Sequence, residues 1–282
     1  MNKDKTATIF DVQKCSFIDG PGIRTTVFFK GCNLACKWCH NPESQTPKRE
    51  LMVQTKRCVG CGKCLEKCPN KFASCDLCGK CTTYCPVSAR EIVGKEYTVD
   101  QVLSEILLDK QFYLSSGGGV TFSGGECMLR VDFLAELLKK CKENGVHTAI
   151  DTAGCVPYES FLKVLPYTDL ILYDVKCFSE ELHLQGTGVS NRLILKNLER
   201  LSRETDCEIM VRIPVIPGYN TAVEELSSME KFLSSLRIKA VELLPYHTMG
   251  NYKYQALNRT PFVYDVPTEE NMAYYKKLFG IE

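Results

Sequence analysis

The sequence predicts an α/β fold, in which an open parallel sheet of six strands forms part of a barrel and a small cysteine-rich segment is inserted. Three observations predict this fold. Strand-like apolar runs alternate with amphipathic helical patterns along most of the 282 residues, which is typical of parallel sheets with right-handed crossovers. Six strand patterns can be counted, whereas a closed barrel would need eight. The segment 51–94 follows neither pattern and holds eight of the 17 cysteines, so we expect a separate insert.

The predicted strands are short runs of β-branched, aromatic and other apolar residues that end at glycine or polar residues. The first, 25–30, reads Thr-Thr-Val-Phe-Phe-Lys and runs directly into Gly31 and the first cysteine of a triplet. The other five cover 120–122, 147–150, 170–173, 208–213 and 240–244.

Helical patterns fill the intervals between the strands. The pattern at 131–144 is the clearest, because its apolar residues recur at helical spacing and Gly145 follows as a stop signal. The other helices are expected at 99–113, 158–166, 191–204 and 222–235, with a last one near 268–279.

A polar motif follows each of the last five predicted strands. These motifs are Ser-Gly-Gly-Glu at 123–126, Asp-Thr-Ala-Gly at 151–154, Asp-Val-Lys at 174–176, Pro214, and Pro-Tyr-His at 245–247. Ligands of α/β sheets and barrels bind at the carboxyl ends of the strands, so the motifs predict one shared site.

The first cysteine run, Cys32, Cys36 and Cys39, supplies three thiolates and then stops. A cubane [4Fe–4S] cluster normally takes four thiolates. Three ligands leave one iron open, and an open coordination position is typical of a catalytic metal site rather than a structural one. A short cysteine triplet also suits zinc, so the spacing alone leaves both metals open.

The insert repeats the cysteine pattern of bacterial ferredoxins twice, and in that pattern the fourth cysteine of each run binds the other cluster. The spacing therefore predicts two [4Fe–4S] clusters. One is held by Cys58, Cys61, Cys64 and Cys85, and the second by Cys75, Cys78, Cys81 and Cys68. Zinc knuckles use cysteine pairs, or cysteine with histidine, and do not match this doubled run.

The other cysteines do not indicate a secreted protein. Disulfide-rich proteins are usually short and secreted, whereas this chain is long and its first eight residues lack the apolar stretch of a secretory signal. We therefore expect a reducing cytoplasm and anaerobic or low-oxygen conditions. Buried free thiols are the expectation for six scattered cysteines: Cys15, Cys127, Cys141, Cys155, Cys177 and Cys207.

Charge and hydropathy argue against two classes of partner. The formal charge of +1 at pH 7 gives no overall field for nucleic acid, and no apolar run approaches the ~18 residues of a membrane span. The insert alone is basic. Its cations have three alternative roles: to keep a small domain solvated, to offset the negative charge of the clusters, or to dock an acidic electron donor. Its cations are Lys56, Arg57, Lys63, Lys67, Lys71, Lys80 and Arg90, and its anions are Glu66, Asp76 and Glu91.

Several motifs resemble a known enzyme family. The cysteine triplet after the first strand, with Trp38 before its last cysteine, resembles the signature of the radical S-adenosylmethionine (SAM) enzymes. Further stretches resemble the enzymes that activate glycyl radical enzymes, which are relatives of pyruvate formate-lyase activating enzyme. They are Ile-Asp-Gly-Pro-Gly-Ile-Arg at 18–24, Phe-Phe-Lys-Gly-Cys at 28–32, Trp-Cys-His-Asn-Pro-Glu at 38–43 and Leu-Pro-Tyr-His at 244–247, followed by Met-Gly at 249–250 and Lys-Tyr at 253–254. The resemblance spans nearly the whole chain.

The resemblance implies both a fold and its domains. It implies a partial (β/α)6 TIM-like barrel of the radical SAM type at 1–50 and 95–282, with a ferredoxin-like insert of two clusters at 51–94. Two positions depart from the family pattern. Cys127 stands where the family often has proline, and Ala153 replaces a more usual Asn or Ser. Neither departure removes a side chain that the chemistry plainly needs.

The activity implied by the resemblance is reductive cleavage of SAM. The open iron of the cluster on Cys32, Cys36 and Cys39 would bind the amino and carboxylate groups of SAM. One electron would then break a carbon–sulfur bond to give methionine and a 5′-deoxyadenosyl radical, which removes a hydrogen atom from a glycine of the partner. Asp19 would lie beside the partner's glycine loop, although an Asx turn explains this residue equally well.

The resemblance assigns further residues to SAM. They are Trp38, Cys39, His40, Gly124, Gly125, Glu126, Asp174, Val175, Lys176, Arg212 and His247. Gly124 and Gly125 would admit the methionyl amino group, and Glu126 would pair with it. Arg212 would bind the SAM carboxylate, with a surface salt bridge as the alternative. His247 and Trp38 have core packing as their alternative.

Asp151 and Asp174 can be interpreted in three ways. They could act as general acid and base, or cap helices. The resemblance suggests instead that they hold a monovalent cation near the SAM carboxylate, with the carbonyl oxygens of Thr152 and Leu172, because oxygen ligands suit a hard cation.

We therefore expect an activating enzyme that uses SAM and three [4Fe–4S] clusters, one that binds SAM and two auxiliary, to install a glycyl radical on a separate enzyme. Its other expected partner is a low-potential electron donor such as flavodoxin or ferredoxin. Two alternatives stay open: another radical SAM enzyme with auxiliary clusters that acts on a small molecule or peptide, and a ferredoxin-type electron-transfer protein. The sequence does not identify the activated enzyme, although the overall resemblance favours a hydroxyproline dehydratase.

Overall fold

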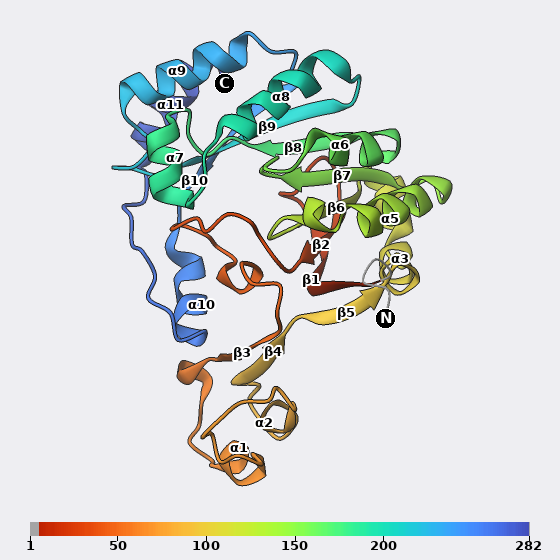
Figure 1. Cartoon of the computed structure of the whole chain (residues 1–282), viewed down its shortest axis with the longest axis vertical. Helices are drawn as coiled ribbons and strands as arrows, with labels where there is room; N and C mark the ends of the chain where they lie inside the picture. Colours follow the sequence, from red (N-terminus) through yellow and green to blue (C-terminus); the bar gives the residue numbers. More distant parts are fainter. Residues whose placement is uncertain (1–5, 282) are drawn as a thin grey trace.

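The computed structural model describes residues 6–281 as a large α/β body with a small lobe that projects from one end (Figure 1). The first five residues, which formed part of the argument against a secretory signal, lie outside the described residues. Within the described part of the chain, no helix is both long enough and apolar enough to cross a membrane.

The large body is built on one sheet of eight strands in the order β10-β9-β8-β7-β6-β2-β1-β5. Its six consecutive parallel strands are β2 (Arg24–Phe29), β6 (Gly119–Gly124), β7 (His147–Thr152), β8 (Leu170–Asp174), β9 (Glu208–Val215) and β10 (Ala240–Pro245). These are the six predicted strands, and the open parallel sheet is confirmed. The two other strands of this sheet, β1 (Thr6–Ser16) and β5 (Lys95–Thr98), were not predicted; β1 pairs antiparallel with both β2 and β5.

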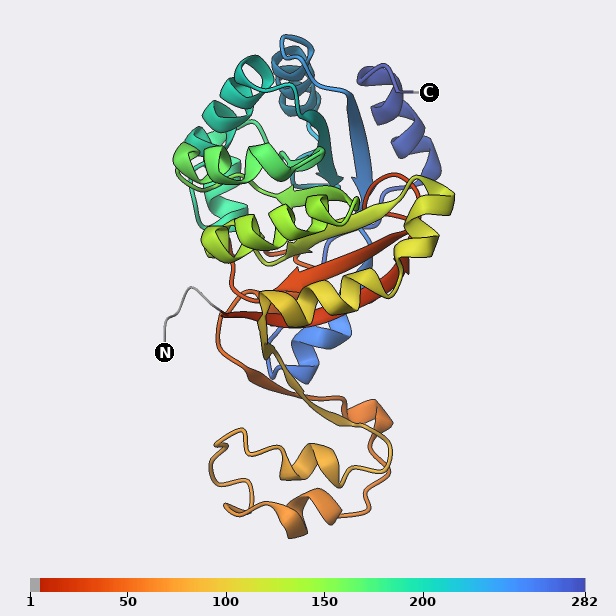
Figure 2. The ribbon, with the colours of Figure 1, turned by 90° about the vertical axis from the view of Figure 1, so that its right-hand side faces the viewer.

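Helices cover one face of the curved sheet (Figure 2). The α-helices of the large body are α3 (Val99–Leu107), α4 (Lys110–Ser116), α5 (Val131–Glu143), α6 (Tyr158–Val164), α7 (Glu180–Thr187), α8 (Arg192–Glu204), α9 (Val223–Ser234), α10 (Asn251–Ala256) and α11 (Glu269–Leu278). Short 3-10 helices are η2 (Pro42–Ser44), η3 (Thr55–Arg57), η4 (Cys127–Arg130), η5 (Leu165–Tyr167) and η6 (Thr248–Gly250). The helices α7 and α10 were not predicted.

The prediction of one helix over 99–113 is wrong, because the chain breaks it at Asp109. The helix α3 begins with a capping box, in which Thr98 and Gln101 satisfy each other's backbone N–H groups. At the break, the buried Asp109 carboxylate accepts a hydrogen bond of 2.8 Å from the Thr25 hydroxyl of β2. This tertiary contact holds Asp109 outside the helical path, and α4 starts at the next residue.

The main core lies between the sheet and these helices. Phe29 of β2 makes edge-to-face contacts with Phe122 of β6 and Phe133 of α5, with ring centroids 6.4 and 6.0 Å apart. The predicted end of α5 is confirmed, because Gly145 has a φ of 69° and the Val146 N–H bonds back to the Cys141 carbonyl.

The small lobe begins and ends with an antiparallel pair, β3 (Glu50–Val53) and β4 (Arg90–Val93). Between them lie two short helices, α1 (Lys63–Lys67) and α2 (Lys80–Thr83). Figure 2 shows this lobe hanging below the large body on the two strands. The lobe coincides with the segment 51–94, whose division as a domain stays a prediction.

The scattered cysteines divide by burial. Cys127, Cys141 and Cys177 are buried, and Cys155 and Cys207 are half-buried. Cys15 is exposed near the end of β1, so the expectation of a buried thiol is wrong there.

Candidate active site

The carboxyl ends of the parallel strands bring the predicted motifs to one edge of the sheet. The segment 31–46, called here the cluster loop, follows β2 and carries the cysteine triplet. It docks on α7, because the Ala35 and Lys37 N–H groups donate to the carbonyls of Thr187 and Gly186 at 2.8 and 3.0 Å. The Asn33 side chain also donates to the Cys155 carbonyl at 2.6 Å, which ties the loop to the end of β7.

The three cysteines of the cluster loop lie in an apolar environment. Cys36 is buried in a cluster with Leu34, Trp38, Ala153, Ile216 and Tyr246, and Cys32 and Cys39 pack against it. Burial raises the pKa of the Cys32 thiol to about 12, and it also raises the pKa values of Cys36 and Cys39.

Thiols in such a site stay protonated unless a metal replaces the proton, since metal ligation requires the thiolate. The residues present therefore fit a thiolate-bound cluster. Among residues 6–281, no three His, Cys, Asp or Glu side chains already surround one metal position. The cluster assignment accordingly rests on ligand spacing and environment.

The motif Gly124-Gly125-Glu126 holds the cluster loop against β6. A Cβ atom on Gly125 would lie 2.3 Å from the Gly31 carbonyl oxygen, and one on Gly124 would lie 2.3 Å from the Phe29 nitrogen. The absence of side chains lets the Gly125 and Glu126 N–H groups each bond at 2.8 Å to the carbonyls of Phe29 and Gly31. The predicted contact of these residues with SAM stays a prediction.

Glu126 is fully buried and makes three hydrogen bonds within the protein. Its carboxylate accepts from the Thr152 hydroxyl at 2.8 Å, from the Ala153 N–H at 3.0 Å and from the Met128 N–H at 3.1 Å. Burial raises the pKa of Glu126 to about 7, which these hydrogen bonds oppose. Glu126 thus joins the ends of β6 and β7 at the mouth of the barrel.

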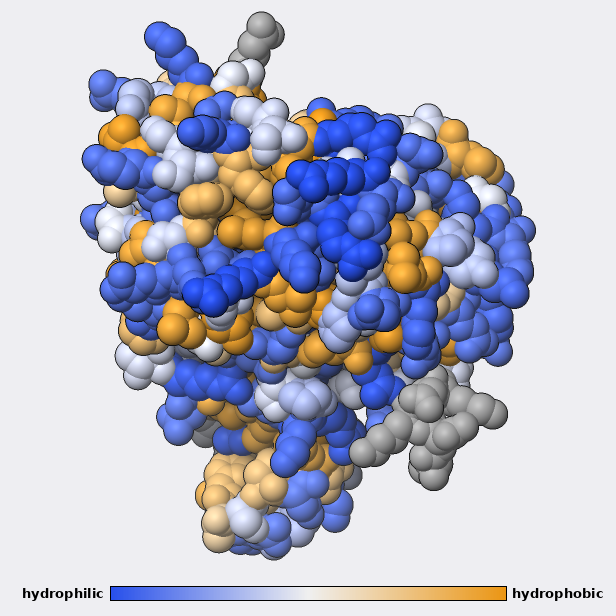
Figure 3. Space-filling model, turned by 45° about the horizontal axis from the view of Figure 1, so that its top comes forward, coloured by the Kyte–Doolittle hydropathy of each residue, from blue (hydrophilic) through white to orange (hydrophobic). Residues whose placement is uncertain are grey.

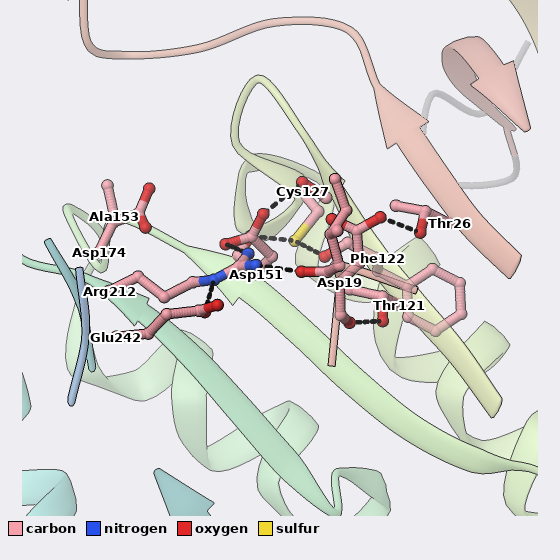
Figure 4. A network of polar contacts seen from close by, with 12 residues as sticks. Asp19, Thr26, Thr121, Phe122, Cys127, Asp151, Ala153, Asp174, Arg212 and Glu242 are labelled. Carbon is pink, nitrogen blue, oxygen red and sulfur yellow. Dashed lines mark hydrogen bonds and ion pairs between the residues drawn. The ribbon is translucent and has the colours of Figure 1, made fainter. Parts of the chain in front are cut away.

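Five charged residues meet beside the cluster loop. Arg212 of β9 reaches toward Asp151 of β7 and Glu242 of β10 (Figure 4), with its nitrogens 3.7 and 3.0 Å from the two carboxylates. Asp174 of β8 pairs with Lys176 at 2.8 Å. Burial raises the pKa of Asp151 to about 6, with a further contribution from the negative charge of Asp174.

This arrangement excludes one alternative role for Arg212 and one for the two aspartates. Arg212 is 6% exposed, so a surface salt bridge is the wrong description of it. Neither Asp151 nor Asp174 is the N-cap of a described helix, since the N-caps of α6 and α7, the helices after β7 and β8, are Pro157 and Ser179. The predicted cation at Asp151, Thr152, Leu172 and Asp174 is not tested by this geometry.

Two histidines stack where the cluster loop meets the end of β10. The rings of His40 and His247 lie 3.9 Å apart, and His40 Nε2 lies 3.0 Å from the His247 carbonyl oxygen. Burial lowers the pKa of His40 to about 4, and His247 contributes to the shift. His247 Nδ1 and the Tyr246 hydroxyl are buried with no hydrogen-bond partner among the described residues. Such atoms are the kind that a bound ligand satisfies.

Trp38 and Val175 belong to the core of the site. Trp38 is buried and packs on Tyr219, with ring centroids 4.6 Å apart, and Tyr264 lies edge-on at 6.4 Å. Val175 is buried, and its N–H donates to the Arg212 carbonyl at 2.9 Å. Core packing accounts for both residues in this structure.

Asp19 organises the turn 16–22 that borders the mouth. Its carboxylate accepts hydrogen bonds from Ser16 and Thr26 at 2.5 and 2.7 Å, and its carbonyl accepts one from Thr121 at 2.6 Å. Figure 4 shows Asp19 between the side chains of Thr26 and Thr121. The Arg212 guanidinium donates to the carbonyl of the preceding Ile18. The turn is therefore linked to the charged cluster.

The insert is a structural repeat of 17 positions. Its cysteines recur at this interval, and so do its left-handed residues, because Gly62 and Gly79 have φ values of 72° and 78°, and Lys71 and Ser88 have 47° and 50°. The thiols also accept equivalent N–H groups. Phe72 donates to Cys68 at 3.4 Å and Ala89 donates to Cys85 at 3.2 Å.

One cavity of about 250 Å³ lies within the insert. The cysteines that line it are Cys68, Cys75, Cys78 and Cys81. Arg90 also lines it, with its guanidinium 4.2 Å above the ring of Phe72. The cavity thus joins three cysteines of the second run with the last cysteine of the first run. This donor set fits a [4Fe–4S] cluster.

Sequence reasoning missed Glu242 and the contact that Ser123 makes. Ser123 donates to Asp151 at 2.5 Å, and Glu242 pairs with Arg212 across neighbouring strands in register. The available signal for Glu242 was a charged residue in the middle of the predicted strand 240–244. Ser123 opens the Ser-Gly-Gly-Glu motif, but its partner could not be read from the sequence.

Comparisons with known proteins agree on one family. Residues 18–194 match a family model described as a 4Fe-4S single cluster domain. The trans-4-hydroxy-L-proline dehydratase activating enzyme of Clostridioides difficile is 46% identical, over 96% of this chain and 95% of the relative. The choline trimethylamine-lyase activating enzyme of Oleidesulfovibrio alaskensis is 40% identical, over 96% of this chain and 91% of the relative.

Solved structures show the same fold. A domain of a pyruvate-formate lyase-activating enzyme from Bacteroides vulgatus is 33% identical, covers 58% of this chain and 94% of its own, and has a TM-score of 0.50. A radical SAM methyltransferase from Sphaerobacter thermophilus is 14% identical, covers 96% and 74%, and has a TM-score of 0.57. The second likeness concerns the fold alone.

Proposed function

Because the chain belongs to the family of glycyl-radical-enzyme activating enzymes, we propose that it installs a glycyl radical on a partner that resembles trans-4-hydroxy-L-proline dehydratase. The enzyme named by the most similar of the relatives above is the basis for this partner. The electron-transfer and small-molecule alternatives are not favoured, since both of those relatives are activating enzymes.

The observation that carries the proposal is the place of the cysteine triplet. It lies at the carboxyl ends of the strands, beside a buried cluster of two carboxylates, Arg212 and Lys176. When bound, a cluster with one open iron supplies the electron that cleaves SAM into methionine and a 5′-deoxyadenosyl radical, and this radical takes a hydrogen atom from the partner's glycine.

The chain's own residues would bind and orient SAM. Arg212 presents its guanidinium to the SAM carboxylate, displacing part of its present contact with Glu242. The unpartnered His247 Nδ1 is available to a polar group of SAM. Asp151, Asp174 and the carbonyls of Thr152 and Leu172 would hold a monovalent cation beside the carboxylate. The apolar residues around Trp38 keep water from the reacting bond.

The insert would hold two further [4Fe–4S] clusters. One is bound by Cys68, Cys75, Cys78 and Cys81, whose side chains line the cavity. The other is bound by Cys58, Cys61, Cys64 and Cys85, from the matching positions of the repeat. We assign these clusters to relaying electrons from a protein donor to the cluster loop.

The donor would dock on the outer surface of the insert. Lys56, Arg57 and Lys63 are exposed there, and Val59 is 65% exposed. Figure 3 shows hydrophobic and hydrophilic residues side by side on the lower lobe. This combination suits an acidic donor such as flavodoxin or ferredoxin in a reducing, anaerobic cytoplasm. Higher salt should therefore slow activation by a protein donor more than activation by dithionite.

Two products test the function. The protein, loaded with iron and sulfide under anaerobic conditions, is mixed with SAM, a reductant and purified trans-4-hydroxy-L-proline dehydratase. We expect 5′-deoxyadenosine and a glycyl-radical EPR signal on the dehydratase. Choline trimethylamine-lyase serves as the matched partner for specificity. A signal on the lyase alone would contradict the chosen partner, and an absence of 5′-deoxyadenosine would contradict SAM cleavage.

A further inference from the structure

The short helix α10 contacts the cluster loop on one side. The Lys253 ammonium lies 2.7 Å from Asn41 Oδ1 and 2.6 Å from Glu43 Oε1. The Tyr254 hydroxyl donates to the Cys39 carbonyl at 3.0 Å. The last cysteine of the triplet and the residues that follow it are therefore held by α10.

The same segment contacts the base of the insert on the other side. Arg259, just after α10, lies 2.5 Å from the carboxylate of Glu50, the first residue of β3, and donates to the Pro42 carbonyl at 2.7 Å. Apolar residues continue this contact, because Ala256 of α10 packs in a buried cluster with Met52 of β3 and Val93 of β4. In Figure 1, α10 runs beside the cluster loop, and its lower end lies near β3.

Glu50 is shared with a third element. Its second oxygen lies 3.1 Å from the ammonium of Lys30, at the end of β2. The Lys30 side chain is fully buried and also donates to the carbonyls of Glu43 and Thr46 in the cluster loop. The Glu50 carboxylate at the root of the insert thus binds Lys30 and Arg259, and both of these side chains donate to carbonyls of the cluster loop.

These contacts differ from the ion pairs on the surface of the insert. The Glu50 side chain is 22% exposed, and its partners Lys30 and Arg259 are 0% and 31% exposed. The pair Glu66–Lys67 within the insert is 68% and 43% exposed. Exposed pairs contribute little, whereas removing one partner of a buried pair leaves an uncompensated charge. The Glu50 contacts are therefore able to fix the position of an element.

We propose that Glu50 is a positioning residue, which with Lys30 and Arg259 holds the insert at a fixed place relative to the cluster loop, so that electrons pass from the insert to the loop. This inference rests on the proposed relay. Electron transfer is sensitive to separation, and the two strands β3 and β4 are the covalent connections between the lobe and the large body. Without the Glu50 contacts, the apolar packing of Met52 and Val93 remains, but the ion pairs that link β3 to Lys30 and Arg259, and through them to the cluster loop, are lost.

The test compares Glu50→Gln with Glu66→Gln, the same substitution in an exposed pair of the same insert. Both are made in the full chain loaded with iron and sulfide. For Glu50→Gln we expect unchanged iron, faster hydrogen exchange in 50–53 and 90–93, and a loss on the order of tenfold in SAM cleavage driven by reduced flavodoxin. With dithionite, which needs no docking on the insert, the rate should stay within about twofold. Glu66→Gln should change none of these.

Arg259→Gln is a second variant for the same test if Glu50→Gln does not retain iron. We again expect SAM cleavage to slow with flavodoxin and to stay nearly unchanged with dithionite. Equal losses with flavodoxin and dithionite would overturn the inference, because the contacts would then support the cluster loop itself. Unchanged rates with both reductants would also overturn it. A Cys75→Ser and Cys78→Ser variant distinguishes the two proposals: if it keeps full flavodoxin-driven activity, the relay fails independently of Glu50.

Discussion

Burial controls the charge of individual residues at the mouth of the barrel. It raises the pKa of Cys32 to about 12, of Glu126 to about 7 and of Asp151 to about 6. Each of these groups resists ionisation in a site with little water. Two cationic side chains, Arg212 and Lys176, balance the carboxylates that remain charged. Under the proposed function, SAM, which carries a carboxylate, an ammonium and a sulfonium, would exchange partners with these groups without leaving a buried charge unpaired.

Asp19 provides the first prediction at this scale. Asp19→Ala removes the acceptor for the Ser16 and Thr26 hydroxyls and loosens the turn 16–22. We expect iron content and SAM affinity to be retained and formation of the glycyl radical to slow on the order of tenfold to a hundredfold, since small misplacements of reacting groups are costly. The measurement is the EPR signal formed per minute on the partner. Near-normal activation would reduce Asp19 to an ordinary turn residue, and lost SAM binding would place it in the cofactor site.

His147 at the start of β7 gives a prediction on pH. Burial lowers the pKa of His147 below 6.5, Arg24 adds to this, and Asp169, Lys142 and Glu208 also act on the ring. The unfolded chain therefore binds more protons, so stability should fall as pH drops below about 6.5 through the lower pKa of the folded state.

The test for His147 is chemical unfolding at pH 7.5 and 5.5. In His147→Asn, the unfolding free energy should change less with pH than in the unmodified protein. The difference between the two slopes should be below ~1.4 kcal/mol per pH unit, because the ring is only half-buried. Burial also lowers the pKa of His183, and the variant keeps the contribution of His183 to the pH dependence. An identical pH dependence in the two proteins would contradict the assignment.

At the scale of elements, close approach of backbones assembles the site. The end of β6 lies directly against the start of the cluster loop because two glycines leave room for it. The loop is then held from the opposite side by α7, through the carbonyls of Gly186 and Thr187. Neither contact depends on a charged residue, so both should persist when the charges of the mouth are rearranged by a ligand.

Gly125→Ala tests the approach of β6 to the loop. The added methyl group would lie 2.3 Å from the Gly31 carbonyl oxygen and 2.9 Å from that of Ser44. We expect a loss of about 1–3 kcal/mol in unfolding free energy and loss of iron from the triplet site, because the cluster loop must move away. Gly145→Ala is the comparison for iron content: its φ of 69° makes alanine strained there too, but its Cβ meets no atom within 4 Å and it lies outside the cluster loop, so iron should be retained. Full iron content in Gly125→Ala would show that the loop adapts.

The sequence predicted the elements whose pattern is local. The six parallel strands and α5 have clear apolar runs or helical spacing with end signals. The strand β1 mixes polar and apolar residues and is recognised only through its pairing with β2, and α7 contains Gly186 within its range. The predicted polar motifs do lie at the ends of the strands, but partners such as Glu242 for Arg212 depend on the register of neighbouring strands, which the sequence does not state.

At the scale of the whole molecule, the large body and the insert differ in construction. The large body has an extensive apolar core between sheet and helices, whereas the insert has short helices with no buried residues. An element so poor in apolar packing depends on other bonds for its order. Metal–thiolate bonds are the ones that its sequence offers.

The cysteine sites of the large body and of the insert together predict the iron content of the whole molecule. The loaded protein should contain about twelve irons, four for each site. Changing Cys32, Cys36 and Cys39 to alanine should leave about eight and abolish SAM cleavage. Iron analysis, together with assay of 5′-deoxyadenosine, checks both statements. A native count near four would contradict the two clusters of the insert.

The cavity in the insert has a consequence for how the protein matures. Cys68 belongs to the first run of cysteines, yet it lines the cavity formed mainly by the second run. Neither half of the repeat can then complete a cluster from its own four cysteines. Under the two-cluster proposal, assembly of the halves is cooperative: inserts with one cluster should be scarce at every stage of iron loading, and damage to either cluster by oxygen should release both.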